Sequence, residues 1–396
     1  MFYLILIFII FYIFTIIKSF LRFLNSRNFI LNKNKTNKTY NKKIDIIIPV
    51  YNEVKNIKSS VSYFKKFYNC CNVYYVTTSK EKSSATYNKL IEEIKRQKTK
   101  NIYVDNCPNI IGTMANQLNY MAKKLEEESI IAIYNVDSRP TIDTFKYVID
   151  NINDREVYQQ VSYFDDKNSG IINSCQMWQN RWSIIYEMGK YISNINYQFK
   201  YTIGHGLFIK KCILDKYGYW SEQDINEDNE LGYRLLINGI KIKGIPFLEK
   251  ADFANNIKIY IKQQSTWVNG PLYAFKYFKN NEKNFKNLVL SVLNFKAFIS
   301  WWLFPIIILL FIFLSLFYQY YTLALIIFLL TIIYVSGLNG IVNKLLIKTG
   351  HIKNCKSNNI FNDLIFFVIH CFGPFITINK IIHGKNNIQN KYNTEK

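Results

Sequence analysis

Several carboxylates open a predicted helix, and this stretch is the first candidate for chemistry. Asn226 has the character of an N-cap, Glu227 and Asp228 lie in the first turn, and Gly239 ends the helix. Carboxylates at the start of such a helix can take up a proton during a reaction. The helix dipole also favours negative charge in a first turn, so an ordinary surface helix with solvated acids is the alternative interpretation.

A second carboxylate follows a predicted strand at residues 130–134. Asp137 lies two positions after Asn135, and together they offer two oxygen ligands. Such ligands suit a hard divalent cation, Mg2+ or Mn2+, which also bridges phosphate groups. The alternative interpretation, which this stretch alone slightly favours, is that Asp137 caps a helix that begins near Pro140.

A buried strand near the N-terminus also ends in polar residues. The run Ile44 to Val50 breaks at Pro49 and continues into Tyr51, Asn52 and Glu53. These side chains could hold the base and ribose of a nucleotide. An ordinary loop between a strand and a helix explains the same residues.

Two further stretches carry groups that could bind a ligand. His205 lies between two glycines ahead of a short strand, where it could contact a phosphate or a hydroxyl group or serve only the fold. Gln263 and Gln264 combine amides with the indole of Trp267. Amides hydrogen-bond hydroxyls and aromatic faces stack on sugar rings; the alternative is an amphipathic interface helix anchored by its tryptophan.

The elements that must position these residues form an alternating pattern. Short runs of β-branched residues alternate with stretches whose apolar residues have the spacing of a helix. This pattern predicts an α/β fold with a mainly parallel sheet. Ligands bind such sheets at the carboxyl ends of the strands, where most of the residues above lie. The predicted strands are residues 44–50, 73–77, 102–104, 130–134 and 157–163, with helical spacing at 56–68 and 113–125.

Apolar stretches at both ends predict an integral membrane protein. The first lacks the basic start and the small-residue cleavage site of a signal peptide, so an anchor is favoured. Lysines after it place the following domain in the cytoplasm by the positive-inside rule. The predicted divisions are an anchor (1–24), a basic juxtamembrane linker (25–43), a cytoplasmic catalytic domain (44–285), an interfacial helix with two to three transmembrane segments (286–380) and a basic tail (381–396).

Composition narrows the partners and the compartment. A net charge of +22, from 50 basic and 28 acidic residues, favours anionic partners. Nucleic acid has only this charge in its favour, so no nucleic-acid partner is expected. A transporter is disfavoured because the apolar stretches carry few ionisable residues. Seven cysteines without a C-x-x-C pair argue against a disulfide framework and a zinc site, and favour a reducing compartment.

Taken in order, these motifs over residues 44–267 resemble the membrane-bound and processive members of glycosyltransferase family 2, which have the GT-A fold. Asn135-Val136-Asp137 resembles the family's D-x-D motif, which implies donor and metal binding. Asn226-Glu227-Asp228 resembles its T-E-D motif, which implies that Asp228 is the catalytic base and that Glu227 orients the acceptor or a loop. The spacing agrees, with 91 residues from Asp137 to Asp228.

Two further motifs extend the resemblance. Pro49, Tyr51, Asn52 and Glu53 match the family's nucleotide-binding strand end, which implies donor binding. The Q-x-x-R-W motif resembles residues 263–267, 35 positions after the implied base. The resemblance thus implies an acceptor or lid role for five residues: Glu227, His205, Gln263, Gln264 and Trp267.

Four positions depart from the family pattern. Asn135 replaces the first acid of D-x-D and Thr266 replaces an arginine that clamps phosphate. Met114 stands where a lysine is usual, and Thr78 follows the second strand where many members have an acid. Weaker metal binding is expected from Asn135, and the loss of the arginine at Thr266 implies either that the donor is held differently or that the substrate is another one.

The resemblance implies inverting transfer of a hexosyl or N-acetylhexosaminyl group from a nucleotide-sugar donor. The expected cofactor is Mg2+ or Mn2+, and the expected acceptor is a polysaccharide or a lipid, with an export or assembly partner. Hydrolysis is disfavoured because a glycosidase needs two carboxyl groups that straddle one bond. The alternative function is a catalytically weak membrane scaffold in envelope-polysaccharide assembly.

Overall fold

The computed structural model describes residues 1–33, 43–165, 168–195, 198–353 and 359–386. Its contacts divide the chain into two compact units, which are described separately below. The sheet unit comprises residues 32–162 and 200–252, and the helical unit comprises residues 1–31, 163–199 and 253–396.

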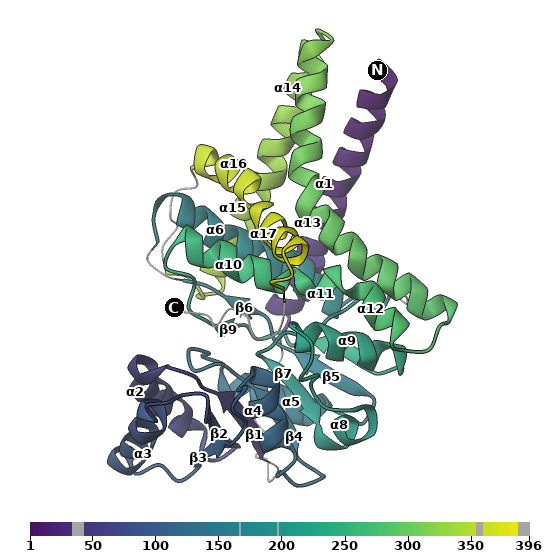
Figure 1. Cartoon of the computed structure of the whole chain (residues 1–396). Coiled ribbons are helices and arrows are strands. Elements are labelled where there is room, and N and C mark those ends of the chain that lie inside the picture. Colours follow the sequence, from purple (N-terminus) through teal and green to yellow (C-terminus); the bar gives the residue numbers. More distant parts are fainter. Residues whose placement is uncertain (34–42, 166–167, 196–197, 354–358, 387–396) are drawn as a thin grey trace. The chain divides into compact units, whose positions relative to one another are not determined.

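The sheet unit contains a seven-stranded, mainly parallel sheet in the order β3-β2-β1-β4-β7-β5-β8 (Figure 1). Only β7 runs antiparallel to its neighbours β4 and β5. This confirms the predicted α/β fold with a mainly parallel sheet. The strands are β1 (Ile44–Pro49), β2 (Cys71–Thr78), β3 (Ile102–Cys107), β4 (Ile130–Ile133), β5 (Glu156–Gln159), β7 (Leu207–Lys210) and β8 (Lys241–Gly244), and β9 (Glu249–Lys250) lies outside this sheet.

Burial on both faces explains why the central strands are almost wholly apolar. In β1 the side chains of Ile46, Ile47 and Ile48 are all buried, as expected for a parallel strand covered by helices. The predicted strand 157–163 is interrupted, since β5 ends at Gln159 and β6 (Ser162–Tyr163) follows as a separate element. The helices of this unit are α2 (Val54–Phe64), η1 (Lys65–Phe67), α3 (Ala85–Gln97), α4 (Met114–Ala122), α5 (Ile142–Asn151), α8 (Lys211–Tyr217) and α9 (Glu227–Ile237).

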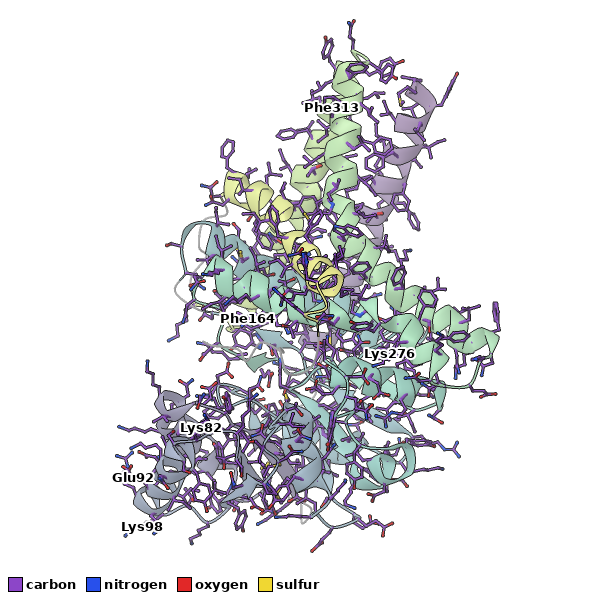
Figure 2. The ribbon with its side chains drawn as sticks, viewed as in Figure 1. Lys82, Glu92, Lys98, Phe164, Lys276 and Phe313 are labelled. Atoms are coloured by element: carbon purple, nitrogen blue, oxygen red, sulfur yellow. The ribbon has the colours of Figure 1, made fainter. Side chains whose placement is uncertain are left out.

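The helical unit contains four stretches that are long and apolar enough to cross a membrane: residues 2–31, 285–317, 321–348 and 360–382. Apolar side chains remain exposed along them, such as Phe313 (Figure 2), as expected for a surface that faces lipid. The helices are α1 (Phe2–Leu31), α6 (Gly170–Arg181), η2 (Trp182–Met188), α7 (Gly189–Tyr191), α10 (Ile257–Trp267), α11 (Asn269–Leu272), α12 (Ala274–Lys279), α13 (Phe285–Phe317), α14 (Tyr321–Ile332), η3 (Ile333–Gly337), α15 (Leu338–Lys348), α16 (Ile360–Ile369) and α17 (Phe372–Ile382).

The domain boundaries from the sequence differ from these units in three places. Residues 25–31, expected in the linker, continue α1 as helix, and residues 34–42 lie outside the described residues. Residues 163–199 and 253–285, expected in the catalytic domain, group with the apolar helices. The predicted tail begins inside α17, and its residues 387–396 lie outside the described part.

Candidate functional site

The loop after β1 is held in place by a buried acid from the loop after β2. Asn52 adopts a left-handed conformation (φ 54°), and its backbone N–H donates to Oε2 of Glu81 at 3.2 Å. The other oxygen of Glu81 accepts from the backbone and hydroxyl of Thr86, at 2.9 and 2.7 Å. The acid therefore fixes Asn52 and begins α3 at the same time.

Two neighbouring strand ends are joined by one buried amide. Nε2 of Gln117, on α4, donates to the carbonyl oxygens of Val50 and Val76 at 2.9 and 2.6 Å. Tyr51 lies beside these ends with its ring 5.2 Å from Nζ of Lys80, while Glu53 accepts from Asn56 in α2 at 2.7 Å. The predicted nucleotide-binding residues thus share one edge of the sheet.

The carboxylate of Asp137 is buried just beyond β4. Its Oδ2 accepts a hydrogen bond from the backbone N–H of Asp252 at 3.1 Å, and the N-cap of α5 is Thr141. The helix-cap interpretation of Asp137 is therefore disfavoured. Asn135 is partly exposed, and its backbone N–H donates to Ser138 at 3.2 Å.

The residues around Asp137 suit a cation that a substrate helps to bind. Among the described residues no group of three His, Cys, Asp or Glu side chains surrounds a common point. Mg2+ and Mn2+ are commonly bound by one or two protein oxygens together with substrate phosphates, rather than by an all-protein cage. Asp137 and Asn135 can supply those two oxygens.

The backbone before Asn135 is rigid because Tyr134 is fully buried. Its hydroxyl donates to Oε1 of Gln160 at 2.6 Å, and burial raises the pKa of this hydroxyl well above its ordinary value. The hydroxyl therefore stays protonated as a donor. Gln160 in turn donates to Thr144 and to the carbonyl oxygen of Phe247, both at 2.9 Å.

The first turn of α9 is pressed against the segment before β7. A Cβ atom added to Gly232 would lie 2.6 Å from the backbone nitrogen of Thr202, so only glycine permits this approach. The hydroxyl of Thr202 donates to the carbonyl oxygen of Asp228 at 2.6 Å. Asn226 is the N-cap position, as predicted, although its side chain makes no capping hydrogen bond.

The carboxylate of Asp228 lies close to the glycine-flanked loop of His205. A Cβ atom added to Gly204 would lie 3.6 Å from Oδ2 of Asp228 and 3.4 Å from Cε of Met114. Asp228 is only partly buried, and its Oδ1 accepts from the backbone N–H of Asn229 at 2.7 Å. A carboxylate at this sheet edge can receive a proton.

Comparison with known families identifies the family of this chain. The sequence model of the family described as Glycosyl transferase family group 2 matches residues 130–338, more than half of the chain. The chain belongs to this glycosyltransferase family. No curated protein sequence matches the chain.

Solved structures agree with the GT-A fold of this glycosyltransferase. A mannosyltransferase from Pyrobaculum calidifontis, PcManGT, in complex with GDP-Man and Mn2+, is similar over 93% of this chain and 97% of its own, with a TM-score of 0.56 and 11% sequence identity. S. aureus TarS 1–349 gives a weaker likeness that supports no argument, with a TM-score of 0.46 and 14% identity over 86% and 92% of the two chains.

The glycosyltransferase carries its predicted site residues in both units. The sheet unit holds the predicted residues at the end of β1, after β4, before β7 and in the first turn of α9. Gln263, Gln264 and Trp267 belong to α10 of the helical unit, where Gln263 and Gln264 are buried and Trp267 is 40% exposed. Gly373 of α17 packs directly on Gln264, so this amide lies in a helix-packing seam. Their acceptor roles stay predictions.

Sequence reasoning missed several residues that shape the site. Glu81, Gln159, Glu249 and Asp252 act through partners far away in the sequence, which no local motif reveals. Glu230 and Arg234 form an ion pair at 2.7 Å within α9, and both side chains are largely buried.

Proposed function

We propose that this glycosyltransferase moves a sugar from a nucleotide-sugar donor to an acceptor hydroxyl with inversion, and that Asp228 is its base. The observation that carries the proposal is the placement of the Asp228 carboxylate beside Gly204, in the same unit and at the same sheet edge as Asn135 and Asp137. Ligands bind this edge in open α/β sheets.

The proposed reaction is a single displacement. The acceptor oxygen forms a bond to the anomeric carbon while Asp228 takes its proton. The bond from that carbon to the diphosphate oxygen breaks, and the nucleoside diphosphate leaves with the electron pair. Attack opposite the leaving group inverts the anomeric configuration.

Asp137 and Asn135 would hold the cofactor, Mg2+ or Mn2+. A bound cation would neutralise the charge that develops on the leaving diphosphate. PcManGT, which shares the fold, was solved in complex with GDP-Man and Mn2+, and this supports a divalent cation as the cofactor. Because one of the two ligands is a neutral amide, we expect weaker metal binding than two acids would give.

We infer that the acceptor is a polysaccharide or a lipid and that the sheet unit acts on the cytoplasmic side. The support is the set of four apolar helices together with basic residues at their ends, such as Lys344 and Lys348 in α15. Gln263, Gln264 and Trp267 are proposed to contact this acceptor, and Glu227 is proposed to orient it. An export or assembly partner is also proposed.

A donor screen tests the proposal. Membranes that contain the full chain are incubated with each common nucleotide sugar and Mn2+ or Mg2+, and the released nucleoside diphosphate is measured. We expect release with one or two donors, and its loss on chelation. The alternative, a catalytically weak scaffold, is motivated by Asn135, Thr266, Met114 and Thr78; failure of every donor to bind with either metal would favour it.

A further inference from the structure

Glu249 is a fully buried carboxylate with a histidine as its partner. Oε1 of Glu249 pairs with Nδ1 of His205 and accepts from the hydroxyl of Ser162 at 2.8 Å. Among the described residues Oε2 of Glu249 has no hydrogen-bond partner, and the side chain is 0% exposed. A buried charge is costly unless it is paired, so His205 stabilises the buried carboxylate of Glu249, and Glu249 in turn holds the ring of His205.

The backbone of His205 is fixed on both sides. Oε1 of Gln159 accepts from the N–H of Ile203 at 2.9 Å, and Nε2 of the same amide donates to the carbonyl oxygen of His205 at 2.8 Å. Gly206 has φ +67°, and a Cβ atom there would lie 2.8 Å from the carbonyl oxygen of Gln160. With the backbone held in this way, Glu249 determines the orientation of the imidazole ring.

The strand pair β4–β7 brings the loop of His205 close to the D-x-D-like motif. β4 and β7 pair antiparallel with Ile133 opposite Leu207, and the N–H of Gly206 also donates to the carbonyl oxygen of Ile133 at 2.7 Å. This bond is one residue out of the strand register, and it ties the residue after His205 to the residue two positions before Asn135. Asn135 is the position at which the sequence lacks an expected acid.

A second connection runs through the segment after β9. Glu249 pairs with His205, and three residues later the N–H of Asp252 donates to Oδ2 of Asp137. One short segment therefore supports both the histidine and the proposed metal ligand. Both connections link His205 to the proposed metal ligands, and they favour the phosphate contact over the acceptor or lid role that the resemblance implies.

The chemistry of the pair determines which ring nitrogen faces the ligand. A carboxylate only accepts, so Nδ1 carries a proton toward Glu249 and Nε2 is the nitrogen on the opposite side of the ring. Nε2 donates when both ring nitrogens carry a proton, which is the form of the ring that binds an anion. The His205 side chain is 21% exposed, which leaves it accessible from one side.

We propose that His205, positioned by Glu249 and Ser162, donates a hydrogen bond from Nε2 to the diphosphate of the sugar donor. This role rests on the proposed function. It supplies positive charge to a diphosphate site whose two proposed metal ligands are one acid, Asp137, and one neutral amide, Asn135. Glu249 and Ser162 are positioning residues that act through the ring.

Calorimetry on the full-length protein in detergent tests the role. UDP and GDP are titrated in the presence of Mn2+, and uridine and guanosine serve as probes without phosphate. We expect His205→Ala to weaken binding of the preferred nucleoside diphosphate about tenfold, since a charge-assisted hydrogen bond is lost, and to leave nucleoside binding unchanged. His383→Ala, at an exposed histidine of the helical unit, is the matched control.

Glu249→Gln should weaken diphosphate binding about threefold to tenfold, and the double variant should bind no more weakly than His205→Ala alone. Ser162→Ala provides a milder variant if Glu249→Gln does not fold. Unchanged diphosphate binding in His205→Ala, or an equal loss for the nucleoside, would overturn the role. If the wild type transfers sugar in a way that depends on Asp228, and His205→Ala binds the diphosphate unchanged, only the role of His205 is rejected. If the wild type binds no nucleotide, the proposed function itself is rejected.

Discussion

Glu249 in the sheet unit and Arg181 in the helical unit are both fully buried charged side chains, yet their surroundings differ. Glu249 pairs with the titratable ring of His205. Nη1 of Arg181 donates to the carbonyl oxygen of Tyr334 at 2.6 Å, and its guanidinium lies 4.4 Å from the ring centroid of Trp178. No acid lies within ion-pair distance of Arg181 among the described residues.

We infer from this difference that Glu249 supports ligand binding, whereas Arg181 supports the packing of helices. Arg181 ends α6, and its carbonyl partner belongs to the π-helical turn η3, so the contact joins two helices of the helical unit. A π-helical turn leaves its backbone groups less regularly bonded, which explains the available carbonyl. We therefore expect substitutions in the sheet unit to reduce binding and transfer, and substitutions near Arg181 to reduce stability.

Among the substitutions that test this comparison, the largest expected effect is at Asp137. Asp137→Ala removes the only acid proposed to bind the metal, and transfer should fall about 1,000-fold because several kcal/mol of charge stabilisation are lost. Released nucleoside diphosphate measures this, with Mn2+ binding as a second readout. Asp150→Ala, at an exposed acid of α5, is the control. Full transfer by Asp137→Ala would remove the metal site from the account.

Arg181→Met tests the other side of the comparison. The variant leaves the Tyr334 carbonyl without its charged donor, and the free energy of unfolding should fall by about 3 kcal/mol. Thermal unfolding in detergent measures the loss, with Arg155→Met at an exposed site as the control. An unchanged melting temperature combined with lost transfer would assign Arg181 to the ligand instead of to packing.

Gly232→Ala should affect both properties. The added Cβ would meet the backbone of Thr202 at 2.6 Å and push α9, with Asp228, away from its neighbour. We expect a loss of about 2 kcal/mol in stability and a lower rate of transfer. Gly337→Ala, where a Cβ has ordinary contacts of 3.8 Å or more, should be neutral or stabilising. Equal behaviour of the two variants would contradict the close approach.

The smallest expected effect is at Glu81. Glu81→Gln keeps the shape but weakens the hydrogen bonds to Asn52 and Thr86, so donor binding should weaken by a few fold, about 1 kcal/mol. Calorimetric titration with the preferred donor measures the change. Glu92→Gln, on the exposed face of α3 (Figure 2), should have no effect. A loss in the control as large as that at Glu81 would show that general charge is responsible.

Local sequence pattern predicted β1 and β4 because each is a short apolar run buried on both faces, whereas β8, which carries Lys241 and Lys243, was not predicted. It predicted Asp137 and Asp228 as candidate site residues because each lies at the end or the start of a regular element. It did not predict Glu249 or Gln159, because their partners come from strands that are neighbours only in the folded sheet. Residues 25–31 were expected in the linker for their polarity, yet the helix tolerates polar residues and continues to Leu31.

The assignment of Asp228 as base is the central claim, and one paired measurement on Asp228→Asn tests it most directly. Donor binding is titrated and released nucleoside diphosphate is followed on the same purified protein with Mn2+. We expect donor binding within about twofold of the wild type and transfer reduced about 100-fold to 10,000-fold, the range for loss of a general base. Retained transfer would contradict the assignment.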